Sequence, residues 1–130
     1  MSAPAFPAGG GVKHDNGKPP LSLLPRDALE GAARVLAFGR DKYGADNWRG
    51  GFAWRRLLDA ALRHVVAFAD GEDLDPETHL PHIDHALCCL LFLSTHAKRG
   101  LGTDDRYRGA PAEPGIVDVE YCDAPEGAKL

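Results

Sequence analysis

Residues 81–100 read PHIDHALCCLLFLSTHAKRG, and this stretch decides the fold of the 130-residue chain. Pro81 suits the first turn of a helix, Gly100 is a typical stop, and the spacing predicts a helix that runs to about Lys98. Its centre, residues 86–93, is apolar on all sides, and such a helix must be covered all round. In a chain this small another subunit can supply the cover, so we expect a homo-oligomer, either a dimer or a tetramer.

Two further helices are predicted ahead of this stretch. The first begins just after Pro25 and ends near Gly39, because apolar residues recur at helical spacing over residues 29–36. The second runs over residues 54–69 and carries a wide apolar stripe. A loop rich in Gly, Asn and Asp separates them. The sequence therefore predicts an all-α protein, a small helical bundle that is completed by oligomerisation.

The segments outside the helices set the expected domain limits. Residues 1–12 are rich in Pro, Ala and Gly, and we expect a flexible N-terminal segment. The helical domain covers residues 13–100, and it opens with an ordered loop that three leucines pin in place: Leu21, Leu23 and Leu24. Residues 101–130 form a C-terminal arm. Within that arm, the alternation at residues 116–121 predicts a strand or a segment that docks on a neighbouring subunit.

Charge and cysteine content narrow the function classes. The formal net charge is −4, which argues against binding of duplex nucleic acid, because phosphate neutralisation needs a basic footprint. Three cysteines, including the adjacent Cys88 and Cys89, lack the spacing of a secreted disulfide framework. We recognise neither a secretory leader nor an apolar run of membrane-spanning length. We therefore expect a cytoplasmic protein with no membrane partner.

Residues 72–85 concentrate side chains that ligate metal. Acids and histidines occupy eight of the fourteen positions: Glu72, Asp73, Asp75, Glu77, His79, His82, Asp84 and His85. Hard divalent cations prefer several carboxylate oxygens, and imidazole adds affinity for transition metals. His82 and His85 share a helix face that leads into apolar sequence, where charge is costly unless it is paired or ligated. The alternative is a solvated acidic loop, because the helix dipole stabilises carboxylates near a helix N-terminus without any metal.

Two further titratable residues each allow two interpretations. His64 lies at the edge of the apolar stripe of the second helix. It is either a satisfied core histidine or an acid/base group that faces residues 72–85. Glu30 either pairs with Arg34 on the surface or completes a metal site between helices.

Residues in the loops are weaker candidates for substrate contacts. Lys13, Lys18 and Lys42 flank loops that contain glycine, and such lysines can hold phosphate as point charges. Asn47 and Trp48 can read and stack a base. Trp48 is equally well explained as a plug that covers the helix ends.

Short runs that recur in order over residues 13–95 resemble a known family. They are Lys13-x-Asp15-x-Gly17-Lys18, Leu23-Leu24-Pro25, Ala28-Leu29-Glu30, Phe38-Gly39, Lys42-Tyr43-Gly44, Asn47-Trp48, Arg63-His64, Gly71-Glu72-Asp73, Asp75-Pro76-Glu77 and His82-x-x-His85-Ala86. Together they resemble the phage dATP/dGTP diphosphohydrolases of the N-terminal domain type. The chain is also similar to the MazZ proteins of phages that replace adenine with 2-aminoadenine.

The resemblance implies a fold, a reaction and a cofactor. The fold would be all-α and related to the MazG-type nucleoside triphosphate pyrophosphohydrolases, with Mg²⁺ or Mn²⁺ at acidic residues. A purine deoxynucleoside triphosphate, dGTP or dATP, would be converted to dNMP and pyrophosphate. In a phage the protein would act in the host cytoplasm, and the product dGMP would feed synthesis of the 2-aminoadenine nucleotide.

A mechanistic hypothesis assigns roles to individual residues. The metal ligands are expected among Glu30, Glu72, Asp75, Glu77, His82 and His85. His64 or a carboxylate such as Glu77 would take the proton of the attacking water. Lys18 and Lys42 would neutralise charge on the leaving group, and Asn47 and Trp48 would bind the base.

Two alternatives belong to other classes of protein. An HD-type metal phosphohydrolase would act on nucleotides with a different fold. A non-enzymatic helical oligomer would bind a host or replication protein through its apolar helix and acidic loop.

Overall fold

Three α-helices carry the fold in the computed structural model, which describes residues 9–109. They are α1 (Arg26–Tyr43), α2 (Trp54–Ala69) and α3 (His82–Arg99). Two short 3-10 helices, Leu21–Leu23 and Asn47–Gly50, precede α1 and α2. Residues 9–109 form no strand beyond two isolated bridges, so the predicted all-α class is confirmed. In this part of the chain no helix combines the length and the apolar character needed to cross a membrane.

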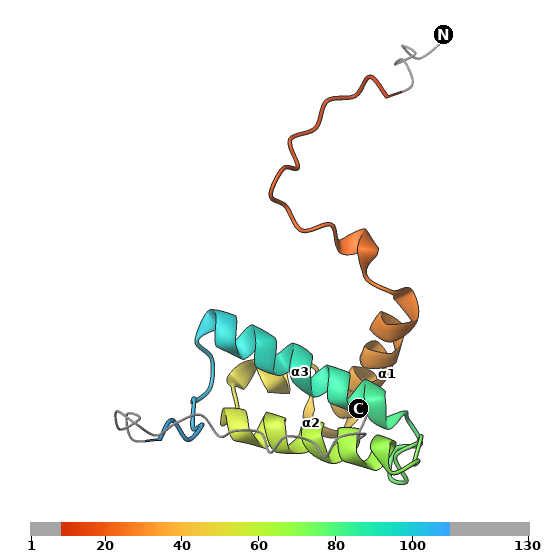
Figure 1. Ribbon diagram of the computed structural model, residues 1–130, viewed down its shortest axis with the longest axis vertical. Helices are drawn as coiled ribbons and strands as arrows, with labels where there is room; N and C mark the ends of the chain where they lie inside the picture. The colour runs from red at the N-terminus through yellow and green to blue at the C-terminus, as the bar shows by residue number, and fades with distance from the viewer. Residues whose placement is uncertain (1–8, 110–130) are drawn as a thin grey trace, which may run out of the picture.

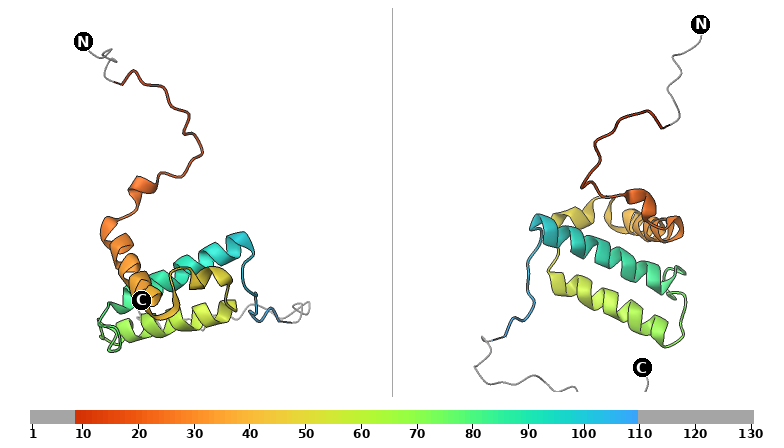
Figure 2. Two further views of the ribbon diagram at one scale, coloured as in Figure 1. Left: turned by 180° about the vertical axis from the view of Figure 1, so that it is seen from behind. Right: turned by 45° about the horizontal axis from the view of Figure 1, so that its top comes forward.

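Helix α3 lies between the other two helices. It contacts both α1 and α2, and the right-hand view of Figure 2 shows it in the middle. Figure 1 shows α2 and α3 side by side, joined by the loop that precedes α3. Small side chains allow the helices to approach closely. The buried apolar residues are Ala32 of α1, Leu57 and Ala61 of α2, and Ala86 and Cys88 of α3.

Considerable apolar surface remains open on the single chain. Leu90 and Leu91 of α3 are 47% and 41% exposed, and Leu62 and Val66 of α2 are exposed as well. Neighbouring helices thus cover α3 on two sides but leave part of it bare. Exposed apolar side chains on neighbouring helices are candidates for an interaction surface. The homo-oligomer stays a prediction, and this surface is what a second copy would cover.

The observed helix ends can be compared with the limits predicted from the sequence. The predicted limits of α2 are confirmed, and α3 ends at Arg99, followed by Gly100 in the left-handed conformation. The predicted end of the first helix near Gly39 is wrong, because α1 continues to Tyr43. A glycine inside a helix costs only about 1 kcal/mol, which the following turn of helix offsets. The actual stop is Gly44, whose φ of 92° is available to glycine.

The predicted ordered loop before α1 is also wrong in its main feature. Leu21 and Leu23 are 72% and 79% exposed and Leu24 is exposed too, so these leucines pin nothing within residues 9–109. Figure 1 shows the reason: this segment runs outward from the helices and away from the rest of the described residues. Residues 1–8 of the predicted flexible segment lie outside the described residues.

The start of the predicted C-terminal arm belongs to the helical unit. The indole Nε1–H of Trp54 donates to the carbonyl of Leu101 over 2.8 Å, and the backbone N–H of Trp54 donates to the carbonyl of Thr103 over 2.9 Å. The backbones of Gly51 and Gly102 lie so close that a Cβ on either would collide with the other segment. The predicted strand or docking segment at residues 116–121 lies outside the described part of the chain.

Candidate functional site

A cavity of about 610 Å³ opens between the three helices and the loop before α3. This volume is within the range of small-molecule sites. Two of its sides differ in composition. The histidine wall is defined here as His64, Asp75, Thr78 and His85, and the α1 wall as Phe38, Gly39, Lys42 and Tyr43.

A hydrogen-bonded chain behind the histidine wall ends at His64. Oε1 of Glu72 lies 2.8 Å from Nε2 of His82, and Nδ1 of His82 lies 2.8 Å from Nδ1 of His64. A carboxylate can only accept, so Nε2–H of His82 donates to Glu72. With Nε2 as the only protonated nitrogen of His82, its Nδ1 accepts from Nδ1–H of His64. His64 therefore keeps an unprotonated Nε2, which no group within residues 9–109 engages.

A second group of hydrogen bonds orders His85. The hydroxyl of Thr78 donates to Oδ2 of Asp75 over 2.9 Å and accepts from Nε2–H of His85 over 2.7 Å. The rings of His85 and His64 stack, with centroids 4.5 Å apart and planes within 9°. Between them in sequence, His79 has a φ of 59°, a conformation that non-glycine residues rarely adopt. Its N–H donates to the carbonyl of Asp75 over 2.8 Å, which helps to hold the turn.

Burial sets the protonation state of the histidine wall. Burial lowers the pKa of His64, and the neighbouring His85 and His82 lower it further. Burial lowers the pKa of His85 as well, although the carboxylate of Asp75 opposes this shift. Burial alone would raise the pKa of Asp75, but hydrogen bonds from Thr78 and the backbone bring it below its usual value. At neutral pH the wall presents two neutral imidazoles and one carboxylate.

Four basic side chains are among the residues that line the cavity. They are Arg40, Lys42, Arg56 and Arg63, and the carboxylates that line it are Asp75 and Glu77. Nζ of Lys42 lies 3.4 Å from Oε1 of Glu77. Arg56 and Arg63 make no ion pair with any residue of the described range 9–109. Four cations facing two carboxylates favour an anionic ligand.

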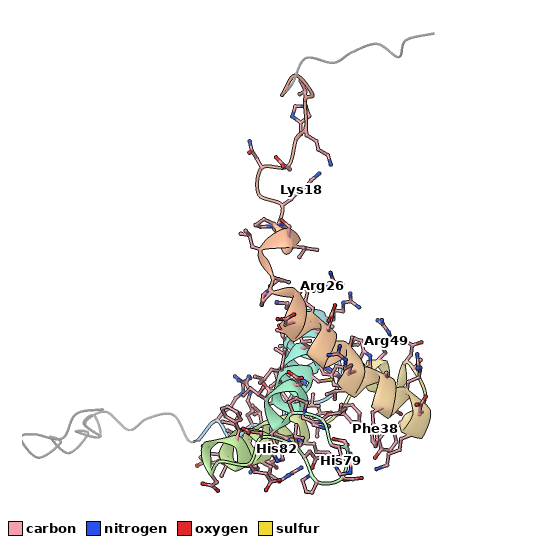
Figure 3. The ribbon with its side chains drawn as sticks, turned by 90° about the vertical axis from the view of Figure 1, so that its right-hand side faces the viewer. Lys18, Arg26, Phe38, Arg49, His79 and His82 are labelled. Carbon is pink, nitrogen blue, oxygen red and sulfur yellow. The ribbon has the colours of Figure 1, made fainter. Side chains whose placement is uncertain are left out.

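The predicted substrate contacts divide into residues that line the cavity and one that does not. Lys42, Asn47 and Trp48 line it. Lys18 lies on the extended segment before α1, and Figure 3 shows it far from Phe38, His79 and His82. Lys18 is therefore not positioned to act on a ligand in this cavity.

Trp48 lines the cavity, but its ring is already in use. One face stacks on Phe92, with centroids 4.9 Å apart and planes within 9°. The guanidinium of Arg49 lies 4.6 Å from the ring centroid, and Asp46 holds that guanidinium through a 2.7 Å ion pair. Trp48 thus acts as the core plug that the sequence offered as the alternative. A base could stack on it only by displacing Arg49.

The predicted metal ligands fall into three places. Asp75, Glu77 and His85 line the cavity, whereas Glu72 and His82 pair with each other behind it. Glu30 lies on α1, where it pairs with Arg26 at 2.6 Å and with Arg34 at 3.6 Å, as the surface alternative requires. Within residues 9–109 no three His, Cys, Asp or Glu side chains gather in an arrangement that could hold a metal ion.

Some divalent cations bind without a complete set of protein ligands. Mg²⁺ is commonly bound by one or two carboxylates together with substrate phosphates and water. Asp75 and Glu77 meet this requirement at the cavity wall, and Glu77 is freely accessible because its side chain is 71% exposed. The residues present therefore fit a cation that arrives with a phosphorylated ligand and do not fit a cation held by protein alone.

Several lining residues were missed from the sequence. Arg56 and Arg63 lie outside the apolar stripe of the second helix and were not predicted as ligand contacts, yet they lie two turns apart on one face of α2 that borders the cavity. Tyr43 was missed because α1 was expected to stop at Gly39, and Phe38 was not predicted as a ligand contact. The spacing of seven between the two arginines is the signal that could have identified them.

The described residues thus form a small all-α domain whose cavity is lined by paired histidines, carboxylates and basic side chains. The chain belongs to the family described as dATP/dGTP diphosphohydrolase, N-terminal, whose model matches residues 8–106. It is 44% identical over 106 residues to the dATP/dGTP diphosphohydrolase of Salmonella phage PMBT28, a match that covers 82% of this chain and 36% of that protein. The chain thus spans little more than a third of that relative. No solved structure matches it.

Proposed function

We propose that this chain binds a purine deoxynucleoside triphosphate in the cavity and hydrolyses it to dNMP and pyrophosphate. One observation carries the proposal: His64, which contacts His82 and through it Glu72, borders a cavity whose other lining groups include four cations. The name of the similar phage protein supports dATP or dGTP as the substrate.

The proposed step begins with a water molecule near His64. The water oxygen attacks the α-phosphorus, and Nε2 of His64 takes the proton. The bond between the α-phosphorus and the oxygen that bridges to the β-phosphorus breaks, so pyrophosphate leaves. The resulting imidazolium donates through Nδ1 to His82, and the negative charge of Glu72 stabilises the chain. His82 and Glu72 are positioning residues in this scheme.

The cations of the cavity would hold the phosphates. Arg56 and Arg63 have no competing carboxylate within residues 9–109, so their guanidinium groups are free for bidentate contacts with phosphate oxygens. Lys42 would exchange its contact with Glu77 for one with the leaving group. Such preorganised charge stabilises the negative charge that develops as pyrophosphate departs.

A divalent cation is part of the proposal. Asp75, Glu77 and His85 are the side chains that would hold Mg²⁺ or Mn²⁺ with the substrate phosphates. When bound, the ion would neutralise phosphate charge and polarise the attacked phosphorus. The product dGMP would be a precursor for synthesis of a modified purine nucleotide, as in phages that use 2-aminoadenine.

The direct test is to incubate the purified chain with each dNTP and Mg²⁺ or Mn²⁺, and to resolve the products by ion-exchange chromatography. We expect dNMP and pyrophosphate from dGTP or dATP. Tripolyphosphate as the product would indicate HD-type chemistry instead. A folded chain that binds dNTP without turnover would refute hydrolysis by this chain alone and indicate a nucleotide-binding domain. No binding with or without metal would favour the interaction protein.

A further inference from the structure

Recognition of the base needs an aromatic or apolar surface that Trp48 does not offer. Both faces of its indole are occupied, by Phe92 and by Arg49. The base-binding surface must therefore be sought elsewhere in the same cavity. This search rests on the proposed function, because it assumes that the ligand is a nucleotide.

Two other aromatic rings line the cavity and remain open. Phe38 is 40% exposed and Tyr43 is 62% exposed. Within residues 9–109 neither ring stacks on another aromatic ring, and Tyr43 has only the ammonium of Lys42, 5.2 Å from its centroid. Figure 3 shows Phe38 on α1, at the end of the molecule where His79 and His82 also lie. Open rings in a cavity are suited to stack a heteroaromatic base.

The glycine between these rings is the more specific observation. Gly39 lies in the interior of α1, where glycine is unfavourable relative to alanine. A Cβ added at Gly39 would meet no atom of residues 9–109 within 4 Å, so packing within this range does not require glycine there. Gly31 on the same helix is different, because a Cβ there would overlap the carboxylate of Asp84. Packing explains Gly31, whereas Gly39 leaves bare backbone facing the cavity.

We propose that the purine base lies over Gly39 of α1, next to the rings of Phe38 and Tyr43. The missing side chain lets a flat ring approach the helix backbone, as glycine does at other close approaches. Lys42 lies on the same helix and makes its 3.4 Å contact with Glu77 across the cavity. The base would thus occupy the α1 wall while the phosphates reach toward Lys42 and the histidine wall. Gly39, Phe38 and Tyr43 are then the residues that set base specificity.

The test compares the same new side chain at two positions of α1. Gly39→Leu fills the proposed site, and Ala33→Leu places leucine at an exposed position that does not line the cavity. Binding of dGTP, dATP, dCTP and inorganic tripolyphosphate to the full chain is measured by calorimetry. We expect Gly39→Leu to weaken purine dNTP binding about tenfold or more, without weakening tripolyphosphate binding. Ala33→Leu should change neither, and both variants should melt no lower than the parent.

Tyr43 provides a second, less invasive comparison. Tyr43→Ala should weaken purine binding, and Tyr43→Phe should retain it because stacking needs the ring and not the hydroxyl. Equal loss of tripolyphosphate and dNTP binding in Gly39→Leu, or no loss of either, would overturn the base site. So would a change in solution mass in Gly39→Leu alone, which would assign this surface to a second copy of the chain. Unchanged turnover in Gly39→Leu refutes only the base site, whereas a parent chain that binds no nucleotide refutes the proposed function too.

Discussion

The two walls of the cavity are built on different principles. On the histidine wall nearly every polar group already has a partner, since Thr78 links Asp75 to His85 and His64 is held from behind. On the α1 wall the rings of Phe38 and Tyr43 are open and a glycine leaves bare backbone. Groups that perform chemistry must be fixed before the ligand arrives, whereas groups that recognise a ligand can be completed by it.

The largest effect is expected where the histidine wall meets the substrate. His64→Gln keeps a side chain that can donate to His82 but removes the basic nitrogen. We expect kcat for dGTP or dATP to fall by about 10²–10⁴-fold, the usual contribution of a general base, with dNTP affinity little changed. Steady-state kinetics and calorimetry measure the two quantities. His14→Gln, on the extended segment, is the matched control, and near-normal kcat in His64→Gln would remove this residue from the mechanism.

The next largest effect is expected for the basic side chains that line the cavity. Arg56→Ala removes a guanidinium that lines the cavity, and Arg55→Ala removes its exposed neighbour that does not. A hydrogen bond to a charged group contributes about 1.5–3 kcal/mol, so we expect kcat/KM to fall about 10–100-fold for Arg56→Ala. Arg55→Ala should be close to the parent. Equal losses in the two variants would mean that helix surface charge in general, and not the cavity, attracts the nucleotide.

Glu72→Gln tests how far the preorganisation of the histidine wall extends. Glutamine can still accept from Nε2–H of His82 but carries no charge to stabilise the imidazolium. We expect kcat to fall about tenfold, and the acidic limb of the pH profile to move to lower pH because the pKa of His64 falls further. Asp73→Asn is the control at the neighbouring exposed acid. A pH profile that keeps its position would show that Glu72 has no influence on the proton acceptor.

Thr78→Val tests how much the hydrogen bonds of the histidine wall contribute to stability, because it removes these bonds without changing any charge. Valine keeps the shape of threonine but breaks the bonds to Asp75 and His85. We expect the free energy of unfolding to fall by about 1–2 kcal/mol, measured by urea denaturation. Thr95→Val, which removes only a bond to the carbonyl of Leu91 within α3, should change it by less than about 0.5 kcal/mol. A similar loss in both variants would argue that the loop is not specifically ordered by Thr78.

The smallest expected effect is the pH dependence of stability. The pKa values of His64 and His85 are lowered in the folded chain, so the unfolded chain takes up protons first as the pH falls below about 6.5. Stability should therefore decrease between pH 7 and pH 5.5, and the melting temperature should follow. His64→Gln should show a shallower decrease. A melting temperature that rises as the pH falls from 7 to 5.5 would contradict the assignment of two buried neutral histidines.

The sequence specified local structure well where one signal acted alone. Helix α2 begins and ends where its apolar stripe does, and Gly100 terminates α3 as its position indicates. The end of α1 was predicted at Gly39 because a glycine after an apolar stripe is a typical helix stop. The helix instead ends before the next glycine, Gly44. For Leu21 and Leu23, apolar character predicted burial, but no surface formed by residues 9–109 covers them.

The arrangement of the cavity depended on contacts that local patterns do not contain. Trp48 meets Phe92, and His64 meets His82, only once α3 has packed beside α2 and the loops have closed. The acids and histidines of residues 72–85 were recognisable as a cluster, but sequence spacing could not separate Glu72 and His82, behind the wall, from Asp75 and His85, in it. Likewise, helical periodicity placed Arg56 and Arg63 outside the apolar stripe without revealing that a cavity opens at its border.

The contact between Gly51 and Gly102 has a consequence for the modularity of the chain. It brings the two ends of the α2–α3 hairpin together, so residues 51–102 form a closed circuit. A short peptide linker could join the two ends of this circuit. The entire histidine wall, with Glu72 and His82, lies inside this circuit, whereas the α1 wall is contributed from outside it. Evolution or an engineer could therefore exchange the segment that carries α1, and with it the preference for a base, while the enclosed histidine wall remains intact.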